Sequence, residues 1–518
     1  MTALTPPPAP GPGHSVPVAD LGVDPSLVRS HLGAEIAVDP ALVERLRQVC
    51  TSVSTSDELR VGAGRDWWPL AVAWAVTGEV PALPAVVARP ATGEEVAAVL
   101  GLCHSEGVPV TPAAGRSGVC GGAVPVFGGV ALDLCGLDGI VGVDDVSMLV
   151  DVAAGTFGDD LEAQLRERHS LTLGHWPQSI AMSTVGGWLA CRSAGQYSTR
   201  YGKIEDMVVG LEVVLADGRL VRTGGAGPRS ATGPDLNQVF VGSEGTLGVI
   251  TQARLRAHPL PETERRAAYT FETFAAGLEA CRRILRRGAT PAVLRLYDLA
   301  ESARSFDLES RCALITLDEG DGGIVDATMA VVAAECRNAG AADPALVERW
   351  LAHRNEVASL EALSRGGVVA DTIEIAAAWR VLPDLYEQAT AALRALPATF
   401  AASAHQSHAY TDGACLYFTF AGMATGPDAP AWPVGGIDAY YRQAWDAVAA
   451  ATAAHGGSLS HHHGVGLNRG RHLRSALGSG FEVLARLKTA LDPEGILNPG
   501  KLGLATPFGT APWPVAQT

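Results

Sequence analysis

The stretch PAAGRSGVCGG, residues 112–122, constrains this chain more than any other because it interrupts an apolar region with four glycines. Gly115, Gly118, Gly121 and Gly122 can take positive φ angles, so successive backbone N–H groups can converge on an anion. We therefore interpret the loop as a phosphate cradle. An ordinary surface loop between two strands is the alternative, since an isolated glycine-rich loop fits both descriptions.

Two further blocks suited to the same task follow at intervals that a single domain can bring together. Residues 178–187 read QSIAMSTVGG, in which a hydroxyl stands beside two flexible residues. Residues 242–251 read GSEGTLGVIT and end in a short run typical of a strand. The second block fits a flat ligand better than a compact one, and all three together favour one ligand-binding site.

Composition and charge exclude several classes of protein. The chain has 518 residues, which is long enough for two or three hydrophobic cores. Its residues are 47% hydrophobic and 18% charged, a composition typical of globular proteins. Its net charge of -16 argues against a basic stripe, so we expect no nucleic-acid partner.

Nothing in the sequence predicts export or a membrane span. Residues 1–17 are proline-rich without a charged start or an apolar segment, which favours a disordered lead-in over a secretory signal. No apolar run reaches the roughly 18 residues that a membrane span requires. Nine cysteines without a CxxC pair indicate reduced thiols, so we expect a soluble, cytoplasmic protein.

Alternating strand and helix patterns surround the glycine loop. Residues 86–89 predict a strand, 93–106 a helix and 108–111 a second strand, an order typical of a parallel α/β unit. Further helices are predicted at 39–49 and 156–168, and further strands at 130–134, 140–144, 148–153 and 252–257. Residues 204–216 alternate into Asp217-Gly218, a hairpin signal, and residues 220–223 return.

Six blocks in this order resemble the FAD-binding oxidases and dehydrogenases of the vanillyl-alcohol-oxidase superfamily. They are the glycine loop, STVGG, ATGPDL at residues 231–236, GSEGTLGVIT, LSHHHGVG at 459–466 and DPEGILNPGK at 492–501. Within the superfamily the chain is most similar to the alkylglycerone-phosphate synthases, from about residue 86 to residue 504. The resemblance implies an α+β fold, with a two-subdomain FAD-binding domain of this type, an α/β substrate (cap) domain and a C-terminal return to the FAD domain.

We expect four segments along the chain. Residues 1–79 form a lead-in and a helical segment, 80–258 the FAD-binding domain, 259–455 the substrate domain and 456–518 a C-terminal active-site segment. The boundary near Pro259 rests on a shift toward Ala-, Arg- and Glu-rich sequence, beginning with a helix predicted over 270–287.

The resemblance implies FAD, held by backbone amides and not by a GxGxxG motif with an acidic ribose ligand. By this resemblance the pyrophosphate lies on Ala113, Ala114, Gly115, Arg116, Ser117, Gly118 and Val119. The flavin and ribityl chain lie on Gln178, Ser179, Ile180, Ala181, Met182, Ser183 and Thr184, and on Cys191, Arg192, Ser193 and Ala194. The remaining face is covered by Glu244, Gly245, Thr246, Leu247, Gly248, Val249 and Ile250. The glycine loop has no histidine where covalent members attach the flavin, so we expect non-covalent FAD.

Two arginines are candidates for substrate binding. Arg295 lies in a predicted strand, 292–298, where an arginine is usually at an edge or paired with a carboxylate. By resemblance it occupies a position that the synthases need for activity. Arg354 lies in a predicted helix, 347–361, together with His353. A surface ion pair is the simpler interpretation of Arg354, whereas the resemblance implies that it binds the anionic substrate.

Two stretches could carry the chemistry. Residues 405–422 predict a turn and an alternating strand with Tyr417 and Thr419 on one face. The triplet His461, His462 and His463 is flanked by glycines, and could be a metal site, an exposed tract or part of the active site. By resemblance, Tyr417 and the triplet match the synthases, whose tyrosine donates or accepts a proton. We expect neighbouring histidines and arginines to bring its pKa toward neutrality.

Two chemistries compete on this scaffold. The metal-dependent D-2-hydroxyacid dehydrogenases resemble GHxGDGNLH and EHGxG where this chain has SHAYTDGACLYF and HHHGVG. A histidine and a glutamate of that pattern are replaced near Tyr417 and at His462, so we expect no metal. The expected reaction is the exchange of the acyl group of acyl-dihydroxyacetone phosphate for a long-chain alcohol. The alternative is oxidation of a D-2-hydroxyacid, which the likeness of DPEGILNPGK to lactate and glycolate oxidoreductases keeps open.

A flavin-binding protein without catalysis is disfavoured by the polar cluster. We expect a small-molecule or lipid substrate and a homodimer, and leave contact with a membrane surface open.

Overall fold

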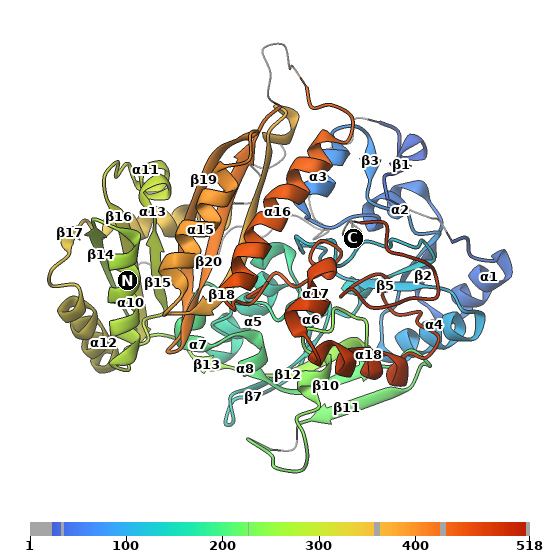
Figure 1. The fold of residues 1–518 in the computed structure, drawn as a ribbon. Coiled ribbons are helices and arrows are strands. Elements are labelled where there is room, and N and C mark those ends of the chain that lie inside the picture. The colour runs from blue at the N-terminus through green and yellow to red at the C-terminus, as the bar shows by residue number, and fades with distance from the viewer. Residues whose placement is uncertain (1–22, 33–35, 226, 357–362, 425–430, 514–518) are drawn as a thin grey trace.

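A computed structural model describes residues 23–32, 36–225, 227–356, 363–424 and 431–513 (Figure 1). The proline-rich lead-in and residues 357–361 of the helix expected at 347–361 lie outside these ranges. Three large sheets organise the fold, and segments from the C-terminal part of the chain return to the first of them. None of the helices in the described ranges is both long and apolar enough to cross a bilayer.

The first sheet contains the strand that enters the glycine loop. Its order is β2 (Ser52–Ser54), β4 (Val86–Arg89), β6 (Val130–Asp133) and β5 (Val110–Ala113), with β4, β6 and β5 parallel. Around it lie α1 (Pro40–Val49), α2 (Asp57–Ala63), α3 (Pro69–Ala75), α4 (Gly93–Glu106) and the short pair β1 (Arg29–Ser30) and β3 (Glu79–Val80). Thr92 accepts a bond from the Glu95 N–H at the start of α4, and Gly107 ends the helix at φ +62°. The predicted parallel unit is confirmed, with β5 two residues later than expected.

The second sheet is antiparallel and carries the other two blocks. Its order is β11 (Leu220–Gly224), β10 (Val208–Val214), β12 (Val249–Arg256), β8 (Leu149–Ala153) and β7 (Ile140–Asp144). With it lie α5 (Gly158–His169), α6 (Val185–Cys191), α7 (Ser198–Tyr201), α8 (Ile204–Met207), α9 (Asn237–Phe240), β9 (Leu171–Thr172) and β13 (His258–Pro259). The hairpin at Asp217-Gly218 is confirmed, but the first residues of the expected strand, 204–207, form α8.

The third sheet forms the wall on which the predicted chemistry lies. Its order is β17 (Gly340–Ala342), β14 (Thr263–Phe271), β16 (Cys312–Gly320), β15 (Val293–Tyr297), β19 (Thr399–Ala409), β20 (Gly413–Gly422) and β18 (Val369–Ala378). With it lie α10 (Phe274–Arg286), α11 (Leu299–Phe306), α12 (Gly322–Glu335), α13 (Ala345–His353), α15 (Leu382–Arg394) and α16 (Gly436–Ala454). The helix expected at 270–287 begins only at Phe274, because residues 263–271 pair with β16 as a strand that the sequence analysis missed.

The two faces of β18 and β20 differ in polarity. Leu416, Phe418 and Phe420 are fully buried and pack in one core with residues of α10, α15 and α16. Figure 1 shows α15 and α16 lying along β19, β20 and β18. Tyr417 and Thr419 alternate with these apolar residues, so they face the opposite side. That polar side borders the predicted FAD-binding blocks.

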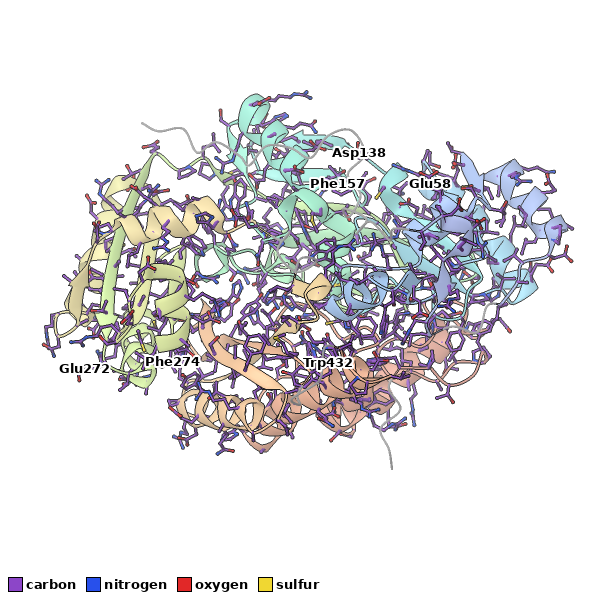
Figure 2. The ribbon with its side chains drawn as sticks, turned by 90° about the horizontal axis from the view of Figure 1, so that it is seen from above. Glu58, Asp138, Phe157, Glu272, Phe274 and Trp432 are labelled. Atoms are coloured by element: carbon purple, nitrogen blue, oxygen red, sulfur yellow. The ribbon has the colours of Figure 1, made fainter. Side chains whose placement is uncertain are left out.

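The chain then closes the site from its C-terminal side. After α16, Ser458 bridges Ala376 at the edge strand β18, and α17 (Gly470–Leu477) and α18 (Gly480–Leu491) follow. Leu497 forms a parallel bridge to Val110 of β5, which completes the expected return to the first sheet. In Figure 2, Glu272 and Phe274 lie toward one end of the molecule, Glu58 toward the other and Phe157 between them.

Candidate active site

A cavity of about 780 Å³ lies where the three sheets meet. It is lined by most residues of the predicted FAD-binding blocks: Ala113, Ala114, Gly115, Arg116, Ser117, Gly118, Val119, Gln178, Ser179, Met182, Ser183, Thr184, Cys191, Ser193, Ala194, Glu244, Gly245, Gly248, Val249 and Ile250. Of the predicted residues, Ile180, Ala181, Arg192, Thr246 and Leu247 do not line it. Tyr417, His462 and His463 lie on its opposite wall, whereas His461, Arg295 and Arg354 do not line it.

The glycine loop has the geometry of an anion cradle. A Cβ atom on Gly115 would stand 2.1 Å from the carbonyl oxygen of Met182, so only glycine fits there. Arg116 takes a positive φ of 53°. The N–H groups of Ser117, Gly118 and Val119 find no acceptor among the described residues. Nε and Nη2 of the buried Arg116 guanidinium also lack partners there, so donors suited to a pyrophosphate converge on the cavity.

Glu244 ties this cradle to the segment that follows the histidine triplet. Its carboxylate accepts bonds from the N–H groups of Val465 and Gly466, and Asn498 donates to its carbonyl oxygen over 2.7 Å. Asn498 also donates to the carbonyl oxygen of Gly122 over 3.0 Å. The DPEGILNPGK block therefore braces two of the cofactor segments, a role that the sequence analysis did not assign to it.

Sheet register places Tyr417 in a row of polar residues. It lies opposite Glu374 of β18 on one side and opposite His405 of β19 on the other. The phenol oxygen lies 2.5 Å from Nε2 of His462 and 3.1 Å from Nε2 of His463. The hydroxyl can donate to one imidazole and accept from the other, so the three side chains form a short path for a proton.

Glu374 is the carboxylate that shapes the histidine loop. It is fully buried and accepts bonds from the N–H groups of His461 and His463, from the Ser460 hydroxyl and from Arg469. Burial disfavours its charge, but Arg469, the two histidines and the bond from the His461 N–H together outweigh that penalty, and the pKa falls from 4.5 to about 2. The sequence analysis missed Glu374. Its only signal there was one acidic residue within the apolar strand sequence TIEIAA.

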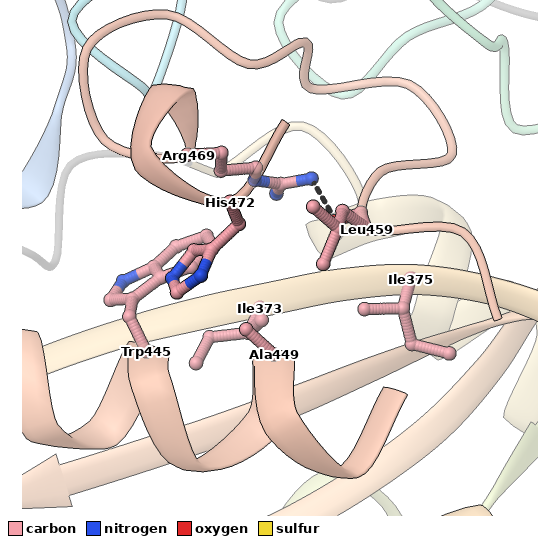
Figure 3. Close-up of a pocket in the computed structure, with 7 residues that line it drawn as sticks. All are labelled: Ile373, Ile375, Trp445, Ala449, Leu459, Arg469 and His472. Carbon is pink, nitrogen blue, oxygen red and sulfur yellow. Dashed lines mark hydrogen bonds between the residues drawn. The ribbon is translucent and has the colours of Figure 1, made fainter. Parts of the chain in front are cut away.

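Arg469 stands beneath the loop at the edge of β18. Its guanidinium lies 2.9 Å from Glu374, donates to the carbonyl oxygen of Leu459 over 2.7 Å and stacks over the Trp445 ring at 4.8 Å. Figure 3 shows Arg469 above Trp445, with Ile373 and Ile375 of β18 below the bond to Leu459. The loop that carries the histidine triplet is therefore anchored on a buried ion pair, and the triplet is not an exposed tract.

The pKa values in this cluster correct one expectation. Burial raises the pKa of the Tyr417 phenol well above its usual value, and the lowering effect of Arg295 and Arg469 does not overcome it. Burial also lowers the pKa of His463 to about 4, and lowers those of His461 and His462. The expected drop of the Tyr417 pKa toward neutrality is therefore wrong. At neutral pH the phenol keeps its proton and the imidazoles are uncharged, so an imidazole nitrogen can accept a hydrogen bond from the phenol.

The two candidate arginines flank Trp350 of α13. The Arg295 guanidinium lies 5.4 Å from the centre of this ring and that of Arg354 lies 5.7 Å from it. Arg295 is on the interior strand β15, where it contacts Tyr297 and His405, so it is neither at a sheet edge nor in an ion pair among the described residues. Arg354 follows the last residue of α13, because that helix ends at His353. Its buried Nη1 has no partner in the described ranges.

Within the part of the chain that the structure describes, two groups of side chains have the geometry to hold a metal ion. Ligand atoms of His408, His461 and His462 lie within 4.8 Å of one another, as do those of Glu374, Cys415 and His462. Some nitrogen atoms of these histidines already take part in other contacts. His461 and His462 approach through their Nδ1 atoms at 2.8 Å, and His408 contacts the Ser198 hydroxyl at 2.7 Å.

The cradle, the cavity and the polar wall fit FAD, and together they define a flavoenzyme. A family model described as "FAD binding domain" matches residues 84–224, and one described as "FAD linked oxidases, C-terminal domain" matches residues 260–502. The chain belongs to this family of FAD-linked oxidases. Its FAD cofactor and its resemblance to the vanillyl-alcohol-oxidase superfamily are thereby confirmed.

Similar proteins include enzymes with two kinds of activity. The uncharacterized FAD-linked oxidoreductase YgcU of Escherichia coli O157:H7 is 32% identical over 81% of this chain and 89% of its own. Alkyldihydroxyacetonephosphate synthase of Dictyostelium discoideum is 31% identical over 82% and 74%. The glycolate oxidase subunit GlcD of Bacillus subtilis is 28% identical over 89% and 96%. A solved structure of an alkyldihydroxyacetonephosphate synthase superposes with a TM-score of 0.74 at 25% identity, over 92% of this chain and 88% of that one.

Proposed function

We propose that the protein exchanges the acyl group of an acylated dihydroxyacetone phosphate for a long-chain alcohol. The observation that carries this proposal is the Tyr417 hydroxyl held between His462 and His463 at the wall of the FAD cavity. The similarity to enzymes named alkyldihydroxyacetonephosphate synthase supports it. Bound FAD supplies an isoalloxazine ring that can react with a substrate carbon.

The residues of the chain would move one proton and hold the substrate. A neutral imidazole takes the Tyr417 proton, and the phenol oxygen then accepts a proton from C1 of the substrate and later returns it. Because His462 and His463 both contact the phenol, either can hold the proton between these steps. Burial keeps the imidazoles uncharged at neutral pH, so each offers a lone pair to the phenol hydrogen, while the raised pKa of Tyr417 makes full transfer of that proton uphill.

Arg354 and the apolar wall support the assignment of the substrate. The guanidinium has an unpartnered buried Nη1 and lies over the Tyr197 and Trp176 rings at 5.2 and 5.6 Å, which suits a fork that binds phosphate. The cavity wall beside Thr419 is lined by Val368, Ala370, Phe400 and Ala421. These residues provide apolar surface for an acyl or alkyl chain.

The test is substrate exchange under anaerobic conditions. The flavin-loaded protein is incubated with acyl-dihydroxyacetone phosphate and a labelled long-chain alcohol. We expect a labelled ether product and flavin that is oxidised after turnover. Absence of the ether, together with loss of the absorbance of oxidised flavin on addition of a D-2-hydroxyacid, would refute the proposal.

The second candidate function is oxidation of a D-2-hydroxyacid. It is favoured by the similarity to GlcD over 96% of that protein and by the uncharged imidazole of His463, which could take a hydroxyl proton. The same anaerobic experiment separates the two functions, because this reaction leaves the flavin reduced.

We also propose a cytoplasmic, homodimeric protein that contacts membranes. All nine cysteines are free thiols, as expected in a reducing compartment. Phe400 is 61% exposed and, with the exposed Leu363, stands where the cavity lining reaches the surface, which is an arrangement suited to a lipid surface. Light scattering tests the dimer, and cosedimentation with phosphatidylcholine vesicles tests the membrane contact. A monomer, or protein that stays in the supernatant, contradicts the respective proposal.

A further inference from the structure

Tyr417 is the last ring of a stack that crosses three strands. The His405 ring lies 4.9 Å from the Tyr417 ring with an angle of 9° between their planes. On its other side, His405 stacks on Tyr297 of β15 at 5.3 Å and 26°. The register pairs Tyr297 with His405 and His405 with Tyr417, so the stack follows directly from strand pairing. The orientation of the phenol therefore depends on the imidazole behind it.

The partners of His405 fix which of its nitrogen atoms carries the proton. Nε2 lies 3.0 Å from Nη2 of Arg295, and a guanidinium can only donate. Nε2 must therefore accept, which leaves the hydrogen on Nδ1. Nδ1 lies 2.7 Å from the carboxylate of Glu301 and donates to it. The ring is held as the neutral Nδ1–H tautomer between a cation on β15 and an anion on α11.

Glu301 connects this ring to the cavity wall. Its carboxylate is buried and also accepts bonds from Thr419 over 2.8 Å and Ser403 over 3.2 Å. Arg304 lies 3.3 Å from it, and both Arg304 and Thr419 line the cavity. One carboxylate thus holds the ring behind Tyr417 and the hydroxyl beside it.

We propose that Glu301, acting through the Nδ1–H tautomer of His405, is a positioning residue for Tyr417. It fixes the ring against which the phenol stacks and so keeps the hydroxyl between His462 and His463. Arg295 acts from the other side by holding Nε2 of His405 as an acceptor. This inference rests on the proposed role of Tyr417 in proton transfer. It assigns the buried Glu301–His405–Arg295 series a function in alignment and not only in stability.

The test is a double-mutant cycle in the ether-forming assay. Glu301→Gln keeps the shape and removes the charge, and we expect kcat to fall roughly 10- to 100-fold with KM nearly unchanged, as for a misplaced catalytic group. In a Tyr417→Phe background the same substitution should cause no further loss, because the group that it positions is already absent. Ser403→Ala is the matched control: it removes one bond to the same carboxylate without touching His405, and kcat should stay near that of the wild type.

A second measurement does not depend on turnover or on the stability of a variant. Imidazole ¹⁵N spectra of the flavin-loaded wild-type protein, with the His405 signal assigned by its loss in His405→Asn, should report the Nδ1–H tautomer. An Nε2–H tautomer would overturn the proposal. So would an equal loss of kcat from Glu301→Gln in both backgrounds, which indicates a general structural role. Full turnover in Tyr417→Phe alone would instead remove the proposed function of Tyr417, and with it this inference, whatever the tautomer.

Discussion

Removing the charge of Glu374 should release the histidine loop from the sheet. The pKa of this carboxyl falls from 4.5 to about 2, which corresponds to roughly 3 kcal/mol of interaction with the charged form. Breaking a buried ion pair from one side costs about 3–5 kcal/mol by an independent measure, because Arg469 would be left without its anion. Glu374→Gln should therefore destabilise the segment 459–466 by about 3 kcal/mol.

Hydrogen exchange is the suitable measurement because it reports local opening of this segment. Global unfolding is less suitable, since a chain with several cores does not unfold in a two-state transition. Backbone amides of His461 and His463, which donate to Glu374, should exchange roughly 100-fold faster in Glu374→Gln. Asp371→Asn is the matched control on the same strand. Burial raises the pKa of Asp371 to about 7, so its neutral isostere should change the protection of the segment little. Unchanged protection in Glu374→Gln, or equal loss in both variants, would refute the reasoning.

The sign of the pH dependence follows from the lowered pKa. The carboxylate contributes stability that is complete above about pH 5 and is lost as the pH falls toward about 2. The ratio of the exchange rates of the His461 and His463 amides in Glu374→Gln to those in the wild-type protein should therefore shrink on acidification. A ratio that stays constant down to about pH 3 would show that the lost stability is not due to this charge.

Four further predictions concern the proton relay, the cofactor and metals. Tyr417→Phe should lower turnover roughly 10²- to 10⁴-fold while flavin content and melting temperature barely change; an unstable but fully active variant would remove the phenol from the mechanism. Gly115→Ala should lose FAD, because its Cβ would stand 2.1 Å from the Met182 carbonyl oxygen, whereas Gly118→Ala, with 3.6 Å to its nearest atom, should retain more; equal FAD occupancy in both would contradict the cradle. The FAD should be released by acid or heat, and flavin left on the denatured chain would show a covalent bond. Activity should survive chelation, and stoichiometric zinc or manganese whose removal abolishes activity would refute the absence of a metal.

The sequence allowed the cofactor side of the site to be predicted because its features are local. Glycines, capping residues and short blocks act within a few positions, as Thr92 and Gly107 show by bounding α4 at both predicted ends. The strand β14 was missed because TERRAAYTF carries charged residues that suit a helix, and only pairing with β16 settles its conformation.

The carboxylates of the site could not be predicted from local patterns. Glu374 is far from His461 along the chain, and Glu301 is farther still from Tyr417. Pairing of β18 with β20 brings Glu374 to the site, and packing of α11 on the sheet brings Glu301. The pKa of Tyr417 is raised, although the sequence analysis expected it to be lowered, and the reason is related. Neighbouring residue types suggest charge, but only the folded chain reveals the burial that opposes it.

The bridge between Leu497 and Val110 also sets an order of events during synthesis. Val110 is on β5, the last strand of the first sheet, and its N–H and carbonyl groups bond Ile496 and Asn498. Ribosomes release residue 110 long before residue 496, so the nascent sheet waits with an unpaired edge that invites association with other chains. A chaperone that shields this edge, or flavin that binds early to the glycine loop beside it, would raise the yield of folded protein.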